Sequence, residues 1–504
     1  MFLGLFPASD EGYYAYAAQQ IHHSLVNGQG IPDSGGLSLY PMLCSWVFSL
    51  QYNPMIALRL IDLGVAIVMA FLWYKVLARI CNNNTGAACI TFIFTFTLNQ
   101  FGFIESGFKN SITVAFVPLL LALYIGIGAV QEKESGNAWW MAGALTALSI
   151  VFRETFAPFA LVGLVSVFIA QGRKAALQFF VGGMAAGIAL VGEILLARGG
   201  IAETIAHYRA AGIVFDAVSG LRLKNFYSYG LQAAYSSSIA LAFSALSIMV
   251  SSIVFFFRRD RSLFLTVVFW LSFIGVALFE PVVKVCYPYH FTILFPGLSG
   301  LCALALREII RLWPVMKWAH GKVNNILVAA GILLSTIWLY FSCSMLAMIY
   351  WPFTLETLVA APGGKWPEKF VHQSELLFIA AEIEKVIPEK GTLSIIMHMQ
   401  SLYPLTGRFP PSYRLNDLST TAILLRFSVP AIRQALLDCA PDVIVFTTKE
   451  DRSIFESILA TEIYEPVVKI PFTRKKMDHF DGVMIFRKTQ ETACLEAQGM
   501  ADWL

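Results

Sequence analysis

The first long apolar stretch of the chain, MIALRLIDLGVAIVMAFLWYKVLARI at residues 55–80, sets the fold class. It exceeds the roughly 20 mostly apolar residues that a helix needs to cross a bilayer. Its four charged residues, Arg59, Asp62, Lys75 and Arg79, lie towards its two ends. We therefore expect a membrane-spanning helix here.

The same criterion yields ten candidate spans along the chain. They cover roughly residues 55–80, 85–103, 109–130, 138–152, 155–171, 175–197, 231–257, 262–279, 288–309 and 324–351. The fourth and fifth are short and are separated only by Phe152-Arg153-Glu154. These two segments form either a tight hairpin or one broken helix. The ten spans together predict a polytopic α-helical membrane protein.

The N-terminus, Met1-Phe2-Leu3-Gly4-Leu5-Phe6, is apolar but too short to span a membrane. It also lacks the basic start and the longer apolar core of a signal peptide. We expect these six residues to be the end of a first span, which would bring the total to eleven.

Charge is distributed unevenly along the 504 residues. The chain is 57% hydrophobic and 14% charged, whereas soluble domains carry roughly 25% charged residues. Residues 352–504 nevertheless hold about half of all the charged side chains. We predict a membrane domain at 1–351, with a first outward loop at 7–54, and a soluble domain at 352–504. The net charge of +3 gives no indication of nucleic-acid binding.

Lysine and arginine cluster in short loops, which in membrane proteins favours the cytoplasmic side. Alternating the ten spans places four clusters on one side: Lys75 with Arg79, Arg173 with Lys174, Arg258 and Arg259 with Arg261, and Arg307 and Arg311 with Lys317 and Lys322. That side is predicted to be cytoplasmic. The soluble domain then faces outward.

The soluble part alternates between helical and strand-like patterns. Helices are expected at 373–388, 430–439 and 450–459, and strands at 392–398, 442–447 and 482–487. This alternation favours a small α/β domain with a partly parallel sheet. A disulfide between Cys439 and Cys494 is an option that the sequence leaves open.

Two adjacent carboxylates, Asp10 and Glu11, lie where the chain leaves the N-terminal apolar residues. Ser9 and Asp10 are residue types that cap helices, and a helix is expected to run to about Leu25. Adjacent helical residues point in different directions, so one carboxylate can face a cleft while the other caps the helix. A carboxylate there can accept a proton from an acceptor hydroxyl or amine. A solvated helix start is the plainer interpretation.

A second candidate is the stretch at 280–296, which begins Glu280-Pro281-Val282-Val283-Lys284-Val285-Cys286-Tyr287-Pro288-Tyr289-His290. It combines a cation, two tyrosines and a histidine at the outer end of a span. Lys284, Tyr287 and His290 could hold a lipid phosphate through charge and hydrogen bonds. They could equally form an interfacial aromatic belt with a snorkelling lysine.

Arg59 and Arg153 are cations at membrane edges, and ionisable residues in such segments are candidates for function. Arg59 has i,i+3 spacing to Asp62, so the two could instead neutralise each other. We find no set of His, Cys or acidic residues with the spacing of a metal site.

In this order the parts resemble the lipid-sugar-dependent glycosyltransferases of the GT-C fold, above all the bacterial relatives of protein O-mannosyltransferases and aminoarabinose transferases. The matching segments are Asp10–Tyr14, Asn53–Leu60, Asn110–Ile127, Gly143–Pro158, Lys284–Pro296 and Tyr403–Pro411. The resemblance implies a GT-C membrane domain of about ten to eleven spans with a small extracytoplasmic α/β domain after it. The interfacial segment Gly35–Pro41 lacks the Lys-Pro-Pro of the aminoarabinose branch.

The resemblance also implies a reaction. A sugar would move from a polyprenyl-phosphate donor to a lipid, glycan or protein acceptor at the outer face of a bacterial cytoplasmic (inner) membrane, with inversion. Asp10, or Glu11 in its place, would be the catalytic base. The donor phosphate would be held by Lys284, Tyr287, His290, Arg59 and Arg153. The fold allows a divalent cation, although the sequence shows no dedicated site for one.

Three other functions are compatible with a membrane domain of this composition. A transporter or flippase for lipid-linked sugars would show internal repeats and charged residues at mid-membrane, neither of which we find. A ligase for lipid-linked polysaccharides would not need the Asp10–Glu11 pair. A receptor with an α/β sensor domain would need no catalytic carboxylate at all.

Overall fold

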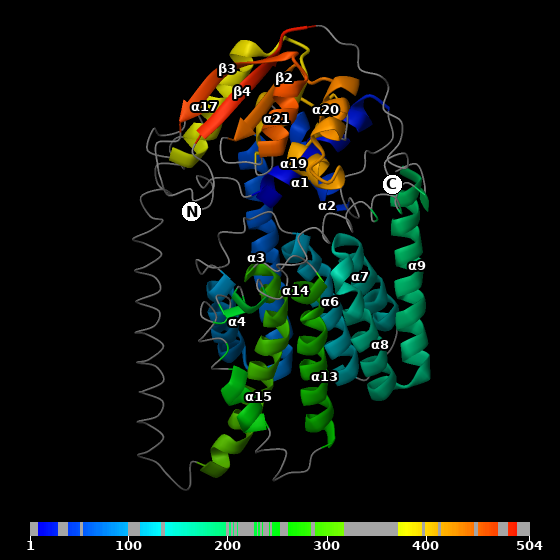
Figure 1. The fold of residues 1–504 in the computed structure, drawn as a ribbon. Coiled ribbons are helices and arrows are strands. Elements are labelled where there is room, and N and C mark those ends of the chain that lie inside the picture. Colours follow the sequence, from blue (N-terminus) through cyan, green and yellow to red (C-terminus); the bar gives the residue numbers. More distant parts are fainter. Residues whose placement is uncertain are drawn as a thin grey trace.

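The structure, a computed structural model, describes most of the chain: residues 9–28, 39–50, 54–98, 111–132, 137–197, 244–251, 261–283, 288–316, 371–395, 399–411, 415–447, 452–471 and 482–490, with a few single residues between 201 and 241. A bundle of long helices carries a small α/β domain on one end (Figure 1). We refer to this end of the bundle as the domain end and to the opposite end as the distal end.

Eight helices make up most of the bundle. They are α3 (Pro54–Cys81), α4 (Asn84–Leu98), α6 (Ser111–Glu132), α7 (Ala138–Phe152), α8 (Ala157–Gln171), α9 (Arg173–Ala197), α13 (Arg261–Ala277) and α15 (Phe295–Met316). Among the described residues, six helical segments are long and apolar enough to cross a membrane, judged by length and composition. The predicted spans at 231–257 and 324–351 lie largely or wholly outside the described residues.

The two short spans around Arg153 form a hairpin. A single 3₁₀ turn, η2 (Glu154–Phe156), joins α7 to α8. Trp139 near the start of α7 and Val167 near the end of α8 pack in one apolar cluster. The two helices are therefore antiparallel, which excludes the alternative of one broken helix.

Helices α7 and α9 pack closely because glycines line their contact. A Cβ atom at Gly143 would lie 1.9 Å from the Phe179 carbonyl oxygen, and one at Gly182 would lie 2.3 Å from the Trp140 carbonyl oxygen. Small residues allow membrane helices to approach in this way. This contact fixes the α7–α8 hairpin, and with it Arg153, against the rest of the bundle.

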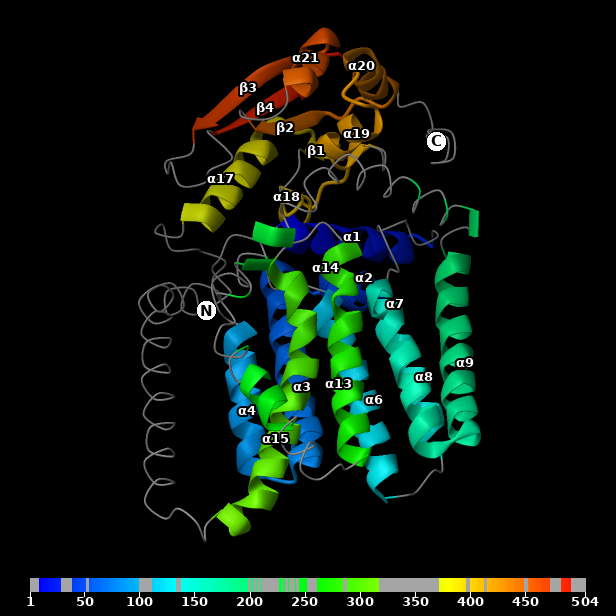
Figure 2. The same cartoon turned by 60° about the horizontal axis from the view of Figure 1, so that its bottom comes forward.

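Short helices cover the domain end of the bundle. They are α1 (Ser9–Val26), α2 (Leu39–Ser45), η1 (Trp46–Ser49), α14 (Phe279–Val283) and η4 (Pro288–Leu294). Helix α1 lies across the ends of the long helices, between them and the α/β domain (Figure 2). The helix expected from Ser9 to about Leu25 is present as α1.

The α/β domain contains one four-stranded sheet. Its elements are α17 (Val371–Val386), β1 (Leu393–Ile395), α18 (Leu402–Thr406), α19 (Leu418–Leu424), α20 (Val429–Asp438), β2 (Val443–Thr447), α21 (Arg452–Ala460), β3 (Tyr464–Pro471) and β4 (Gly482–Lys488). The strand order is β1-β2-β4-β3, with β1 parallel to β2 and the other pairs antiparallel. The prediction of a partly parallel sheet is confirmed.

Side chains alternate between the two faces of this sheet, as the strand period requires. Val443 and Val445 pack in a core with α17 and α18, while Ile444 and Phe446 pack in a second core with α20 and α21. The sequence patterns did not predict β3. Pro466 lies within this strand, and a shift in its pairing with β4 after Pro466 interrupts the alternation of side chains between the two faces of the sheet. The predicted domain boundary between residues 351 and 352 lies outside the described residues.

Candidate functional site

Four buried polar residues meet at the domain end of the bundle. Arg153 follows α7, Thr155 lies in η2, Glu280 in α14 and His290 in η4, and each exposes 9% of its surface or less. Arg153 donates to Glu280 through Nη2 and also through Nε, 3.4 Å from Oε2. Thr155 donates its hydroxyl to Glu280, and His290 Nε2 lies 3.8 Å from Glu280 Oε1.

The Glu280 carboxylate is the centre of this cluster. A buried charge must be paired and hydrogen-bonded, because leaving water costs several kcal/mol per ion. Arg153 has an extended backbone, φ −152° and ψ 106°, which ends α7 and frees the residue from helical geometry. The cluster therefore ties the α7–α8 turn to the segment between α13 and α15.

The structure brings together two of the predicted phosphate ligands, Arg153 and His290, and places a carboxylate between them. The other two predicted in this segment, Lys284 and Tyr287, lie outside the described residues. Glu280 and Thr155 were not assigned a role from the sequence. Glu280 begins the candidate stretch at 280–296, and its pairing could have been expected, because it is one of few acids at the membrane edges and needs a cation to be buried.

Arg59, the fifth predicted phosphate ligand, lies in a separate polar group at the start of α3. It is buried, as is Asp62 one turn later. The Tyr40 hydroxyl of α2 donates to Asp62 Oδ1 at 2.6 Å, and the Tyr14 ring of α1 packs edge-on against Tyr40 at 5.2 Å. Helices α1, α2 and α3 are thus linked through polar and aromatic side chains.

Asp10 and Glu11, the predicted catalytic acids, belong to the first turn of α1. Their side chains are outside the described part of the structure. Contacts with the α/β domain hold the helix that carries them. At Gly12, a Cβ atom would lie 2.6 Å from the backbone nitrogen of Ser401, so only glycine allows α1 to lie this close to the α/β domain.

Tyr16 anchors α1 in the α/β domain. Its ring stacks on Tyr403 of α18, with centroids 4.4 Å apart, and it is fully buried in the same core as α17 and β1. Gln19 Nε2 adds a bond of 3.4 Å to the Tyr403 carbonyl oxygen. Burial raises the pKa of both phenols well above their ordinary value, so they stay protonated.

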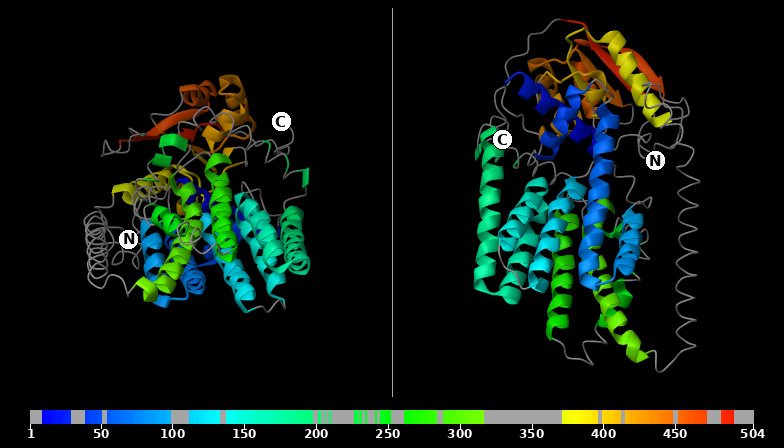
Figure 3. Two further views of the ribbon diagram at one scale, coloured as in Figure 1. Left: turned by 90° about the horizontal axis from the view of Figure 1, so that it is seen from below. Right: turned by 180° about the vertical axis from the view of Figure 1, so that it is seen from behind.

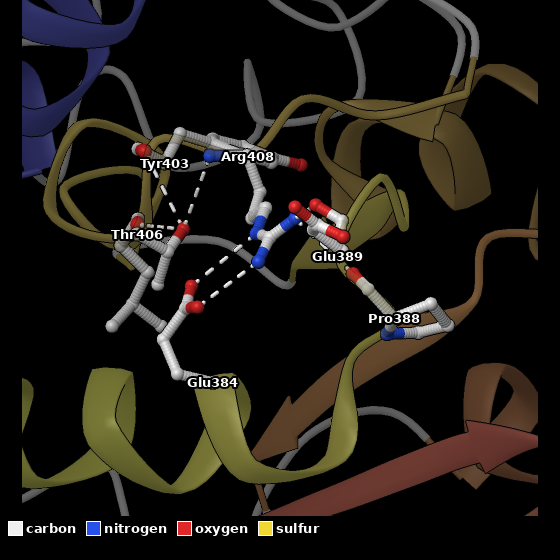
Figure 4. A network of polar contacts seen from close by, with 7 residues as sticks. Glu384, Pro388, Glu389, Tyr403, Thr406 and Arg408 are labelled. Atoms are coloured by element: carbon white, nitrogen blue, oxygen red, sulfur yellow. Dashed lines mark hydrogen bonds and ion pairs between the residues drawn. The ribbon is translucent and has the colours of Figure 1, made fainter.

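The tail loop Tyr403–Pro411 is held in turn by Arg408 (Figure 4). The Arg408 guanidinium donates to both Glu384 oxygens, at 3.3 and 3.0 Å, and to the carbonyl oxygens of Pro388 and Glu389. A second ring contact, between His23 and Phe409 at 4.7 Å, joins the loop to α1. The α/β domain therefore positions the acidic helix, a role that the sequence did not predict.

The described residues offer no group of three His, Cys, Asp or Glu side chains that could hold a metal ion. Arg153, Thr155, Glu280 and His290 interact instead with one another through ion pairs and hydrogen bonds. This arrangement holds the helix that carries Asp10 and Glu11 at the same end of the bundle as the buried Arg153–Glu280 pair.

Comparison with known proteins gives matches among solved structures. The chain is similar to the Archaeoglobus fulgidus oligosaccharyltransferase tethered with an acceptor peptide (TM-score 0.53, 13% identity, 96% of this chain and 70% of that chain). It is also similar to AglB from the same organism with an inhibitory peptide and a dolichol-phosphate (TM-score 0.51, 13% identity, 91% and 68%). No family model matches the sequence, and no curated protein matches it.

A third similar structure is ArnT from Cupriavidus metallidurans bound to undecaprenyl phosphate, with a TM-score of 0.52 at 13% identity, over 96% of this chain and 94% of that chain. The likeness thus extends over both the helical bundle and the α/β domain. It agrees with the six apolar helices long enough to span a membrane. The chain is therefore a multi-pass membrane protein with the GT-C fold.

Proposed function

We propose that this protein is an integral-membrane glycosyltransferase that uses a polyprenyl-phosphate-linked sugar as donor. The observation that carries the proposal is the fold, which is shared over 96% of the chain with an oligosaccharyltransferase and with an ArnT structure bound to undecaprenyl phosphate. An AglB structure of the same fold holds a dolichol-phosphate. The acceptor is a lipid, a glycan or a protein.

In the proposed reaction Asp10 is the general base. Its carboxylate takes the proton of an acceptor hydroxyl or amine while the acceptor atom attacks the anomeric carbon of the sugar. The bond from that carbon to the phosphate oxygen breaks, and polyprenyl phosphate leaves with the electron pair. One displacement inverts the anomeric centre. The support is that α1 begins at the domain end and is fixed there by Gly12 and Tyr16.

The donor phosphate is proposed to bind near Lys284, Tyr287 and His290. Residues 284–287 join Glu280 in α14 to His290 in η4, and both of these residues belong to the buried cluster. The connection between α14 and η4 is therefore anchored by a buried residue on each side. Arg59 and Arg153 are proposed to add positive potential from within the bundle, although Arg153 already shares its charge with Glu280.

The domain end is proposed to face outward from a bacterial inner membrane. Two observations support this orientation. Lys75, Arg79, Arg307 and Arg311 meet at the distal end, and cationic loops favour the cytoplasm. Cys439 of the α/β domain is disulfide-bonded, and disulfides persist in oxidising compartments. Cys494, the partner considered from the sequence, lies outside the described residues.

The test is sugar transfer in membranes supplied with a polyprenyl-phosphate sugar. Asp10→Asn should lower the rate at least ~100-fold, the lower range for general-base catalysis. Glu11→Gln is the matched variant: it should keep most of the activity if Asp10 is the base, and it should show the large loss instead if Glu11 takes that place. Near-normal transfer by Asp10→Asn, with the variant folded, would exclude Asp10 as the base. A parallel assay with a chelator decides whether a divalent cation takes part.

A further inference from the structure

A polar cavity of about 600 Å³ opens at the distal end of the bundle, away from the candidate site. It lies among the ends of α3, α4, α6 and α15, and Figure 3 (left) views the bundle from this end. Its lining includes four cations, Lys75, Arg79, Arg307 and Arg311, but only one carboxylate, Glu132.

Arg79 is held in place within this cavity. Its Nη1 donates to the Tyr124 carbonyl oxygen at 3.1 Å, and its guanidinium carbon lies 3.9 Å from the centre of the Tyr124 ring. A Cβ atom at Gly128 would lie 1.5 Å from Nη1, so the Arg79 guanidinium lies directly against the α6 backbone at this glycine. Glu132 lies 3.6 Å from Nη2. The guanidinium is thus fixed before any ligand binds.

The other cations leave an excess of positive charge. Arg307 and Arg311 share the single carboxylate of Glu308, at 2.9 and 3.3 Å. The Lys75 ammonium lies 5.3 Å from the Phe71 ring and 5.8 Å from the Tyr74 ring, and none of the described carboxylates forms an ion pair with it. Within the part of the chain that the structure describes, four cations therefore face two carboxylates, Glu132 and Glu308.

We propose that this distal cavity binds the phosphoryl group of an anionic ligand, either a lipid headgroup in the adjacent leaflet or a free phosphate. Guanidinium groups match the geometry of phosphate oxygens, and an ammonium adds a compact charge. Basic pockets between membrane helices bind anionic headgroups. Cations that serve only to set the membrane topology would not need to line one cavity. Their side chains would also not need contacts that hold them in place, as the contacts of Arg79 do.

The test measures lipid binding to the full-length protein in detergent by native mass spectrometry. The probes are dioleoyl-phosphatidylglycerol and dioleoyl-phosphatidylcholine, which differ in headgroup charge. The double variant Lys75→Gln/Arg311→Gln removes two cations of the cavity. Each cation near an anionic surface contributes about fivefold in affinity, so the double variant should bind phosphatidylglycerol about 25-fold more weakly.

Lys174→Gln is the matched control, because Lys174 is an exposed cation in the first turn of α9 and does not line the cavity. An equal loss in the control and the double variant would overturn the proposal, as would equal binding of the two lipids. Displacement of bound lipid by millimolar inorganic phosphate would assign the cavity to a soluble phosphate, and its failure would assign the cavity to a headgroup. The result is independent of Asp10, and the double variant should keep sugar-transfer activity.

Discussion

The two ends of the bundle use charge in opposite ways. At the domain end Arg153 and Glu280 neutralise each other, and both are buried beside His290. At the distal end the cations Lys75 and Arg311 line an open cavity. Buried pairs fix positions because breaking them is costly, whereas exposed cations cost little and are available to ligands. The charges at the domain end thus hold side chains in fixed positions, whereas the charges at the distal end are available to attract an anion.

Glu280→Gln should have the largest effect on stability. It leaves the Arg153 guanidinium buried without its counter-charge, which costs about 3–5 kcal/mol. The measurement is thermal unfolding of the detergent-solubilised protein. Glu132→Gln is the control, because Glu132 also pairs with an arginine but is 62% exposed at its side chain, and it should cost less than about 1 kcal/mol. Equal losses of stability in Glu280→Gln and Glu132→Gln would contradict the contrast between the buried pair at the domain end and the exposed charges at the distal end.

Tyr16→Leu should have an intermediate effect on stability. It keeps an apolar side chain in the core but loses the stack on Tyr403, which contributes about 0.5–1.5 kcal/mol. The rate of sugar transfer should fall more than the loss of stability can explain. The reason is that α1 carries Asp10 and that the variant removes the contact anchoring α1. Phe378→Leu, at an exposed position on α17, is the control for both measurements. If Tyr16→Leu transferred sugar at the normal rate, the α/β domain would have no role in positioning α1.

Asp442→Asn should have the smallest effect, and one that depends on pH. Burial alone would raise the pKa of Asp442, but bonds from the Thr392 amide and from Lys488 lower it below the ordinary value. A lowered folded-state pKa stabilises the protein above the unfolded pKa, about 3.9, and this stabilisation is lost as the pH falls through the folded-state value.

We therefore expect Asp442→Asn to cost about 1 kcal/mol at pH 7 and the difference from wild type to shrink below pH 4. The measurement is hydrogen exchange of the β1 and β2 amides across this pH range. Asp438→Asn, at an exposed site on α20, should show no such trend. A difference that stayed constant down to pH 2 would contradict the assigned cause of the pKa shift.

Much of the fold could be predicted from the sequence, and the site only in part. The apolar run at 55–80 became α3, and the strand patterns at 442–447 and 482–487 became β2 and β4. The sequence left the hairpin around Arg153 undecided and did not indicate β3. Arg153 and His290 were given a role from the sequence, whereas Glu280, although it lies in the same candidate stretch as His290, was not. The proposed roles of seven residues all stay predictions: Asp10, Glu11, Lys284, Tyr287, His290, Arg59 and Arg153.

The sequence by itself determined which segments enter the membrane and where positive charge gathers, because hydropathy and charge are properties of short stretches of chain. Only the tertiary structure decided which charges are neutralised and what holds α1. Arg153 and Glu280 are 127 residues apart in the chain, and Gln19 and Tyr403 are 384 apart. Such pairs depend on the packing of distant helices, and no local pattern of residues encodes that packing.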